Sequence, residues 1–575
     1  MKRSVLSLLL IALVVPVQAR EFDLILRQGT LVDGTGAARR VADVGVIGDT
    51  IAAVGNLAGS RGKREIDARG LIVAPGFVDL HGHLDGPTGL NSPDPRRRAA
   101  QNFVAQGITT AAVNQDGRQP PDILKERADM EGSGGIGVNV ALFNGHNTLR
   151  AMVMGDNQAR PATREEISKM QDILRRGLEE QGSFGLSLGL EYFSGQHSTT
   201  DELVDLAKVL APYGGIYLAH IRSQGISPMW YKPSVHKDPP PTLEFSLQES
   251  IRVAEETGVT TIVTHMKGWG PGYRGQAKKW VQLLQSARDR GARIFIDLYA
   301  FNSAGSDGDF VMLPPWSIGG QIYNELQRTD YDYRVALRAT LENAAKSADI
   351  SRDVEHQVAL KGGAENVVVL DYVDPSYVGK TIAELMRLRG LNLTELAVAL
   401  QLEGNPYKAG GIKLRALSLD EADLDVYFAQ PWTAMGTDGA IVLPEEAVGP
   451  RKYVGTNRRY FGTYPQRIAY YSQQRKVDTL EEAIRKSSGL GADILNLPDR
   501  GLVMPGYKAD LVVFDLANLR DNTSVAEPNV YPSGVNFVFV NGVAAVDNGE
   551  RTLARAGRVL DPVGRPAWRG EPAAR

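Results

Sequence analysis

Residues 259–297 read VTTIVTHMKGWGPGYRGQAKKWVQLLQSARDRGARIFID, and this stretch indicates the fold. Thr261 to Val263 is a short apolar strand, residues 278–290 have helical spacing, and Arg293 to Asp297 returns to a strand. Upstream, a helix over residues 248–257 leads into the first of these strands. Short strands that alternate with helices are typical of a parallel sheet closed by crossover helices. The sequence therefore predicts an α/β fold with a (β/α)8 TIM-type barrel.

Both ends of the chain have a different pattern, rich in strands and turns. Phe22 to Leu26 is strand-like near the start, and Leu511 to Phe514 and Val535 to Val540 are strand-like near the end. Asn541-Gly542 then supplies a favoured hairpin turn. We expect one β-sandwich domain built from both chain ends. The predicted division is a signal peptide at 1–19, β-sandwich segments at 20–74 and 496–575, and a barrel at 75–495 with an insertion within about 303–430.

The first residues predict export. Lys2 and Arg3 precede an apolar stretch from Leu6 to Val15, and Val17-Gln18-Ala19 supplies small residues for cleavage. An uncleaved N-terminal anchor is the other interpretation. No later segment reaches the roughly 18 apolar residues that a spanning helix needs. We therefore expect a periplasmic or secreted protein without stable membrane association after signal cleavage.

Composition excludes several classes of function. The 575 residues are 43% hydrophobic and 23% charged, and the formal net charge is −3, so nothing favours a nucleic-acid partner. The chain has no cysteine, which excludes disulfides, zinc–thiolate sites and cysteine nucleophiles. The sequence carries no signal for a particular oligomeric state.

Histidines gather where barrel strands are expected to end. His81 and His83 form an H-x-H pair after the strand Leu71 to Val73 and the turn Pro75-Gly76, and residues two apart share one face of a strand. Each histidine alone could be a loop or core residue. Two more end predicted strands, however: His220 after Ile216 to Ala219, and His265 after Thr261 to Thr264. Because active sites lie at the carboxyl ends of barrel strands, these four predict a metal site.

Asp438 follows Pro431 to Met435, which we interpret as the last barrel strand. An aspartate beside glycine is often only a turn former. At this strand end, its carboxylate could take a proton from a metal-activated water and return it to a leaving nitrogen.

These residues resemble the amidohydrolase superfamily and, more narrowly, the N-acyl-D-amino-acid deacylases (D-aminoacylases). The resemblance covers nearly all of the chain after the signal. Its landmarks are Pro75 to His83, Gly145 to Arg150, Gly185 to Tyr192, Ala219 to Arg222, Thr264 to Lys267, Gly455 to Pro465 and Gly501 to Leu511.

The resemblance implies roles residue by residue. His81, His83, His220 and His265 match ligands of one or two divalent metal ions, with zinc expected, and Asp438 matches the catalytic aspartate. Tyr192, Lys267 and Tyr299 match positions that hold the carboxylate or scissile carbonyl of the substrate, although both tyrosines could also be core aromatics. Arg222, two residues past His220, could bind a substrate carboxylate or pair with a neighbouring acid.

Three short segments depart from the family pattern. Asp116 stands where the family has a cysteine, and we predict that it is a metal ligand, although Asp116-Gly117 is also a common turn pair. Asn457 replaces a histidine, and Ala300-Phe301 replaces a Pro-Tyr pair. No lysine ends the segment Thr109 to Val113, so the carboxylated-lysine site of hydantoinase-type enzymes is not favoured.

The predicted function is metal-dependent hydrolysis of a linear amide, converting a small N-acyl-D-amino acid and water into a D-amino acid and a carboxylate. A prolidase-like dipeptidase or a cyclic amidase is the alternative enzyme. A binding protein that keeps the metal site without turnover is the alternative of another class.

Overall fold

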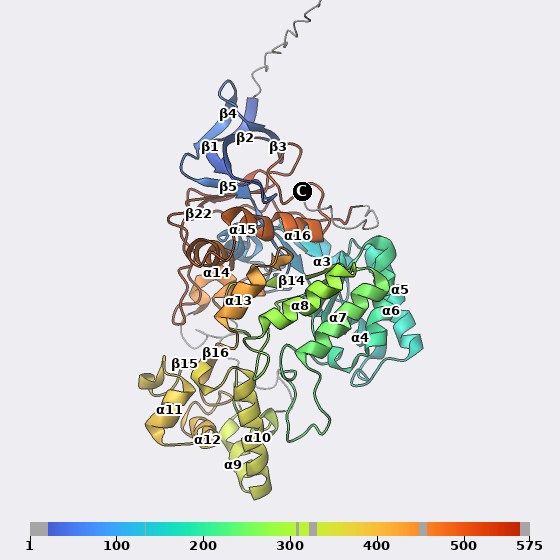
Figure 1. The fold of residues 1–575 in the computed structure, drawn as a ribbon, viewed down its shortest axis with the longest axis vertical. Helices are drawn as coiled ribbons and strands as arrows, with labels where there is room; N and C mark the ends of the chain where they lie inside the picture. Colours follow the sequence, from blue (N-terminus) through green and yellow to red (C-terminus); the bar gives the residue numbers. More distant parts are fainter. Residues whose placement is uncertain (1–20, 133, 306–309, 321–330, 448–456, 564–575) are drawn as a thin grey trace, which may run out of the picture.

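The computed structural model describes residues 21–132, 134–305, 310–320, 331–447 and 457–563. The predicted signal at 1–19 lies outside these residues. Figure 1 shows a β domain at one end, a barrel in the middle and a helical insertion at the other end. In the described part of the chain, no helix is both long and apolar enough to cross a bilayer.

The barrel is built from parallel strands that follow each other in chain order. Its strands are β6 (Phe77–Asp79), β8 (Ile108–Val113), β9 (Asn139–Leu142) continued by β10 (Asn144–Gly145), β11 (Gly185–Gly189), β12 (Ile216–His220), β13 (Thr260–Val263), β14 (Ile294–Leu298) and β17 (Thr433–Met435). The ring closes where Leu80 N donates to Met435 O at 3.0 Å. The short parallel pair β7 (Gly82–His83) and β18 (Gly439–Ala440) extends this closure. The predicted (β/α)8 barrel is confirmed.

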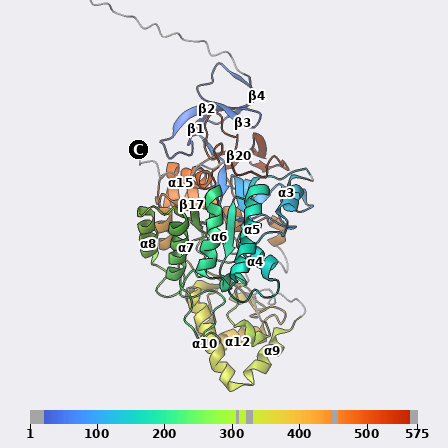
Figure 2. The same ribbon diagram turned by 90° about the vertical axis from the view of Figure 1, so that its right-hand side faces the viewer.

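Helices cover the outside of the barrel (Figure 2). They are α1 (Pro95–Arg98), α2 (Gln101–Val104), α3 (Ile123–Glu131), α4 (His146–Met154), α5 (Arg164–Glu180), α6 (Thr200–Leu210), α7 (Leu243–Thr257), α8 (Ala277–Asp289), α13 (Glu421–Phe428), α14 (Arg459–Gln466), α15 (Leu480–Ser487) and α16 (Gly489–Ile494). Helix α6 shows why they form. Thr199 caps it by accepting a hydrogen bond from Glu202 N, and its apolar stripe, which includes Leu203 and Leu206, is buried.

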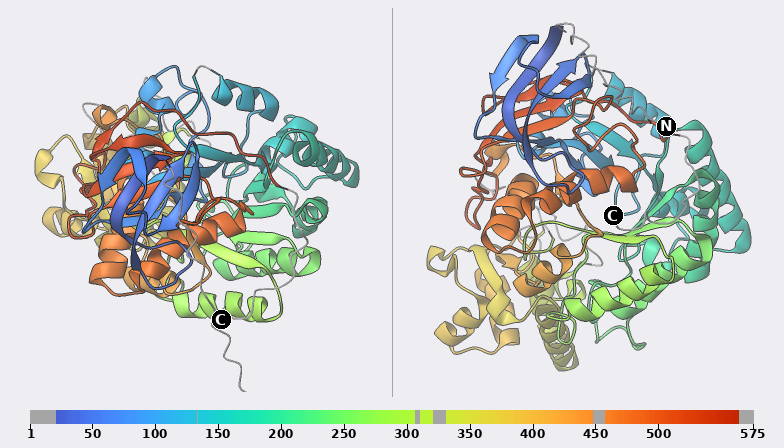
Figure 3. Two further views of the ribbon diagram at one scale, coloured as in Figure 1. Left: turned by 90° about the horizontal axis from the view of Figure 1, so that it is seen from above. Right: turned by 45° about the horizontal axis from the view of Figure 1, so that its top comes forward.

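The two chain ends share one sheet, in which Figure 3 shows the blue N-terminal strands beside the red C-terminal strands. It contains β1 (Glu21–Leu31), β2 (Arg40–Ile47), β3 (Thr50–Gly55), β4 (Arg61–Asp67), β5 (Ile72–Pro75), β19 (Leu511–Phe514), β20 (Val535–Val540), β21 (Val543–Asp547) and β22 (Glu550–Arg551). The ends join where β5 pairs antiparallel with β19. Asn541 and Gly542 both have positive φ between β20 and β21, as the predicted hairpin requires. The β-sandwich domain from both termini is thus confirmed.

The apolar strand before the H-x-H pair, Leu71 to Val73, lies in the terminal sheet, where β5 pairs with β1 and β19. The barrel strand is the next one, β6, which pairs with β8. Gly76 separates the two strands, and an added Cβ there would overlap the Thr109 side chain. The chain therefore passes from one domain to the other within a few residues of the site.

The insertion between β14 and α13 has its own apolar core, which includes Leu337, Val354 and Leu400. Its elements are α9 (Tyr333–Leu341), α10 (Ala344–Leu360), β15 (Val367–Asp371), α11 (Ile382–Arg389), α12 (Leu393–Glu403) and β16 (Lys413–Ala416). Helix α10 docks on the loop after β12, where Ser234 N and Oγ donate to Asp353 at 2.9 and 2.6 Å. This contact places one end of α10 beside the barrel.

Candidate metal centre

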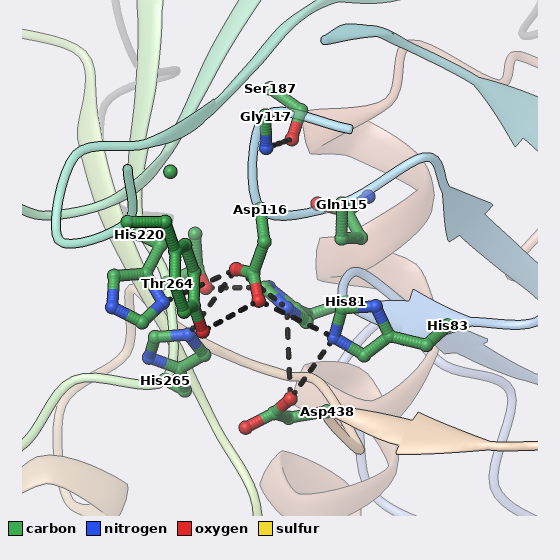
Figure 4. Close-up of polar contacts among 12 residues, drawn as sticks. His81, His83, Gln115, Asp116, Gly117, Ser187, His220, Thr264, His265 and Asp438 are labelled. Atoms are coloured by element: carbon green, nitrogen blue, oxygen red, sulfur yellow. Dashed lines mark hydrogen bonds and ion pairs between the residues drawn. The ribbon is translucent and has the colours of Figure 1, made fainter. Parts of the chain in front are cut away.

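The predicted metal-site residues meet at the carboxyl end of the barrel. His220 is the last residue of β12, and His81, Asp116, His265 and Asp438 lie just beyond β6, β8, β13 and β17. Figure 4 shows Asp116 and Asp438 pointing into the group of histidines from different sides. Residues separated by more than 350 positions thus form one cluster, as expected for barrel strand ends.

Asp116 lies at the centre of this cluster and faces four imidazoles. Its Oδ1 lies 3.2 Å from His220 Nδ1, 3.6 Å from His81 Nε2 and 3.8 Å from His265 Nε2. Its Oδ2 lies 3.6 Å from His83 Nε2. A carboxylate in this position can bridge two ions or complete the ligand set of one.

Asp438 approaches the same histidines from the last barrel strand. Its Oδ1 lies 3.2 Å from His83 Nε2 and 3.9 Å from His81 Nε2. The donor atoms form two compact groups: His81 with His83 and Asp438, and His81 with Asp116 and His265. Because the two groups adjoin and the two oxygens of Asp116 face different histidines, the cluster offers donors for one ion or for two neighbouring ions.

A layer of polar side chains orients the imidazoles. Hydrogen bonds join His81 Nδ1 to Thr264 Oγ1 at 2.6 Å, His220 Nε2 to Glu191 Oε2 at 2.9 Å, and His265 Nδ1 to Gln224 Nε2 at 2.8 Å. The remaining nitrogen of each ring faces Asp116. This is the usual arrangement around a metal, in which one ring nitrogen is fixed and the other binds the ion.

Unpartnered atoms test whether the residues fit a metal. His81 Nε2, His220 Nδ1 and Asp116 Oδ1 are buried without a hydrogen bond of acceptable geometry in the described structure. Buried polar atoms are normally satisfied, and leaving one unsatisfied costs about 1–3 kcal/mol. Nitrogen and oxygen donors converging on one point suit zinc and similar divalent ions. The residues therefore fit the predicted metal.

The electrostatics keep both carboxylates ionised. Burial alone would raise the pKa of Asp116, but the imidazoles of His220, His265 and His81 hold it well below its ordinary value. Burial would likewise raise the pKa of Asp438, but the Arg459 guanidinium and His83 outweigh it. Burial also lowers the pKa of His81 to about 4, against the attraction of the two aspartates. Burial would also lower the pKa of His220, but Asp116 and Glu191 outweigh it and raise this pKa to about 9. Because a metal ligand must be a neutral imidazole, metal binding would release a proton from His220.

Three site residues have backbones in the left-handed region: Asp116 at φ 57°, His265 at φ 35° and Asp438 at φ 47°. Such backbones persist only where neighbours enforce them. Asp297 accepts a hydrogen bond from His265 N at 2.8 Å, and Asp438 N donates to His81 O at 2.7 Å. The side chains are thus held in place before any ligand arrives.

Gly117, the residue after Asp116, fixes the backbone turn at Asp116. Gly117 N donates to Ser187 Oγ at 3.0 Å. Its φ is 74°, and an added Cβ would overlap the side-chain oxygen of Asn147. The Asp-Gly pair is therefore a turn, as one interpretation held, and the turn aims the carboxylate at the histidines.

A cavity of about 590 Å³ opens over the cluster. Its lining includes Tyr192 and Lys267, both predicted to hold substrate. The Tyr192 hydroxyl donates to Asp116 Oδ2 at 3.0 Å, and Lys267 Nζ lies 3.1 Å from His265 Nδ1. Both side chains therefore adjoin the metal cluster and the space above it.

The other two predicted substrate residues lie elsewhere. Arg222 does not line this cavity, because its guanidinium pairs with Glu249 at 3.0 Å, which is the alternative stated for it. The assignment of Arg222 to substrate binding is corrected accordingly. Tyr299 is buried below the lining with its hydroxyl unpartnered in the described structure, and its ring lies 5.4 Å from Lys267 Nζ. It supports Lys267 from behind.

Sequence reasoning missed Arg459. Its Nη2 lies 3.2 Å from Asp438 Oδ2, and its Nε donates to Asp438 O at 2.7 Å. The available signal was its position two residues after Asn457, which departs from the family pattern. In the structure, the Asn457 side chain donates to Gly305 O at 2.7 Å. Lys361 was also missed. It belongs to the insertion and lies more than 90 residues in sequence from every metal-site residue except Asp438, but it lines the cavity.

A model described as the amidohydrolase family matches residues 64–211 and 429–546. The chain is 28% identical to the D-aminoacylase of Alcaligenes xylosoxydans xylosoxydans over 94% of this chain and 98% of that protein. A solved D-aminoacylase with a binuclear metal centre has TM-score 0.68 and 27% identity, covering 94% of this chain and all of that one. The N-acyl-D-glutamate deacylase of Bordetella bronchiseptica, solved with zinc and a phosphonate mimic of the tetrahedral intermediate, has TM-score 0.67 and 25% identity, with 94% of this chain and all of that one covered.

Proposed function

Because this chain belongs to the amidohydrolase family, we propose that it hydrolyses the amide bond of an N-acyl-D-amino acid with a divalent metal, zinc by the precedent of its relative. The substrates are small molecules, in keeping with the cavity of about 590 Å³.

One observation carries the proposal: an ionised carboxylate stands beside the metal cluster at the mouth of the cavity. Asp438 Oδ1 lies 3.2 Å from His83 Nε2, while Oδ2 faces Arg459. A protein that only bound ligand would not need a base at this point. This arrangement favours an enzyme over a binding protein.

The histidines and Asp116 would hold one or two ions. A bound divalent ion would lower the pKa of the attacking water and polarise the scissile carbonyl. The left-handed turn at Asp116 and the hydrogen bonds behind His81, His220 and His265 fix the ligand atoms in advance. Preorganisation of this kind avoids reorganisation during the reaction.

Asp438 then acts twice on protons. It accepts a proton from the water as its oxygen attacks the carbonyl carbon, and it donates that proton to the amide nitrogen as the C–N bond breaks. The products are a carboxylate and a free amino acid. Lys267 and Tyr192 line the space where the substrate must lie, so they are the groups available to orient its α-carboxylate and carbonyl.

We also propose export, which rests on the basic, apolar and small-residue segments within residues 1–19. N-terminal sequencing of the protein from the periplasm or medium should begin after Ala19. Recovery only in the cytoplasm, with Met1 retained, would contradict export.

The test of the proposed activity is turnover of paired N-acetyl D- and L-amino acids by metal-stripped and zinc-reloaded protein. We expect zinc-dependent release of the free amino acid with the D series favoured. Turnover confined to X-Pro dipeptides or to hydantoins would support the prolidase-like or cyclic-amidase alternative. Ligand binding without any turnover would leave the binding-protein interpretation.

A further inference from the structure

We propose that Lys361 binds a second carboxylate of the substrate and makes the enzyme selective for doubly anionic N-acyl amino acids. This inference rests on the proposed function and adds the substrate class. It concerns a residue of the insertion, outside the metal cluster.

Lys361 reaches the cavity from the end of α10. It caps that helix, lines the cavity together with Gln357 one turn earlier, and places its ammonium 3.7 Å from the centre of the Trp269 ring. Trp269 also lines the cavity, and its ring lies 5.7 Å from Lys267 Nζ. The two ammonium groups are therefore at most about 9.4 Å apart, the sum of the two distances.

Lys361 has no acidic partner within ion-pair distance among the described residues, unlike most cations in this structure. Among the other cations on the wall, Arg459 faces Asp438, and Lys232 donates to the carbonyls of Met229 and Tyr231. Arg118 also lines the cavity, with its guanidinium 5.3 Å from the centre of the Tyr192 ring. The stacking on Trp269 attracts the Lys361 ammonium but neutralises no charge. Burial lowers the pKa of Lys361 to about 8, so it remains largely protonated at neutral pH.

Lys361 and Lys267 also repel each other across the cavity. A ligand with two carboxylates would relieve this repulsion by placing one charge near each ammonium. Bond lengths of about 1.5 Å put the carboxylate carbons of a glutamate-like group roughly 4–5 Å apart. With an N–H···O contact of about 2.8 Å at each end, such a ligand reaches up to about 10 Å. It can therefore contact both ammonium groups, which are at most about 9.4 Å apart.

The second carboxylate can come from two places, the amino-acid side chain or the acyl chain. N-acetyl-D-glutamate carries it on the side chain, and N-succinyl-D-leucine carries it on the acyl group. N-acetyl-D-glutamine and N-acetyl-D-leucine are the singly anionic counterparts, which keep only the α-carboxylate. Comparing kcat/KM within each pair shows which end of the substrate faces Lys361. We expect at least one pair to favour the dianion by about 10-fold or more, as a charge-assisted hydrogen bond implies.

The variants are Lys361→Met, Lys361→Arg and the control Lys346→Met, which removes an exposed lysine from the same helix. Lys361→Met should lower kcat/KM for the preferred dianion by about 10- to 100-fold and leave its singly anionic counterpart within about twofold. Lys361→Arg should retain much of the preference, and Lys346→Met all of it.

Equal losses on the dianionic and singly anionic substrates, with an unchanged melting temperature, would overturn the inference. A wild type without preference for the dianions would also overturn it. Turnover of all four substrates with zinc but without charge discrimination contradicts this inference alone. No turnover on any substrate contradicts the proposed function as well.

Discussion

Arg459 holds Asp438 at two points, by a hydrogen bond from Nε to the main-chain carbonyl at 2.7 Å and by Nη2 at 3.2 Å from the carboxylate Oδ2. The other carboxylate oxygen is left facing His83. Arg459 therefore keeps the Asp438 carboxylate ionised and orients one carboxylate oxygen toward the metal cluster.

Replacing Arg459 should weaken catalysis through Asp438. Arg459→Met is expected to lower kcat by about 10- to 100-fold, the loss of one charge-assisted hydrogen bond. Because Arg459 lowers the pKa of Asp438, its removal should move the acid limb of the kcat/KM profile to higher pH. Arg458→Met is the matched control, since Arg458 pairs with Asp521 instead. An acid limb that does not move would show that Arg459 acts elsewhere.

Asp116 should contribute to metal affinity. Asp116→Ala removes the carboxylate that faces four imidazoles and should lower the metal content that survives dialysis against a weak chelator. Asp116→Cys should restore binding and shift preference from manganese toward zinc, because thiolate is a softer ligand. Asp85→Ala changes another carboxylate of the cavity wall and should keep the wild-type metal content. If Asp116→Ala retained metal as tightly as wild type, Asp116 would be a turn residue and not a metal ligand.

The metal cluster could be predicted from the sequence because the barrel topology brings the ends of its strands together. His81, His220 and His265 each end or follow a strand, so a correct assignment of strands brings them together. The first barrel strand, β6, was not identified as a separate strand, because it is only three residues long and directly follows an apolar strand of the other domain.

Contacts that depend on the direction in which a side chain points could not be predicted from the sequence. Nothing in the order of residues shows that Arg222 turns toward Glu249, or that Arg459 reaches back to Asp438. Lys361 depends on how the insertion docks, which rests on contacts such as Ser234 with Asp353 rather than on periodicity. Such contacts follow from tertiary packing, which local pattern does not specify.

Glu126 should make stability fall with rising pH. It is buried beneath the barrel end, accepts a hydrogen bond from Asn114 Nδ2 at 2.9 Å, and burial raises its pKa to about 8. Between pH 4.5 and 8 the folded protein keeps this proton while the unfolded chain loses it, so the free energy of unfolding decreases by up to about 1.4 kcal/mol per pH unit from this group.

Glu126→Gln retains the shape and removes the titration. Urea unfolding of wild type and variant at several pH values from 5 to about 8.5 should show a shallower decline for the variant. Identical slopes would mean that Glu126 is ionised in the folded protein or stays protonated through a different contact.

The most direct test of the account is the turnover of zinc-loaded Asp438→Asn beside wild type on the best N-acyl-D-amino acid. The amide matches the carboxylate in size but cannot accept the proton, and loss of a general acid–base group costs about 10²–10⁴ in rate. We predict a kcat lowered by at least that range, with bound zinc and melting temperature close to wild type. A variant that folds, holds zinc and keeps most of the wild-type kcat would contradict the account.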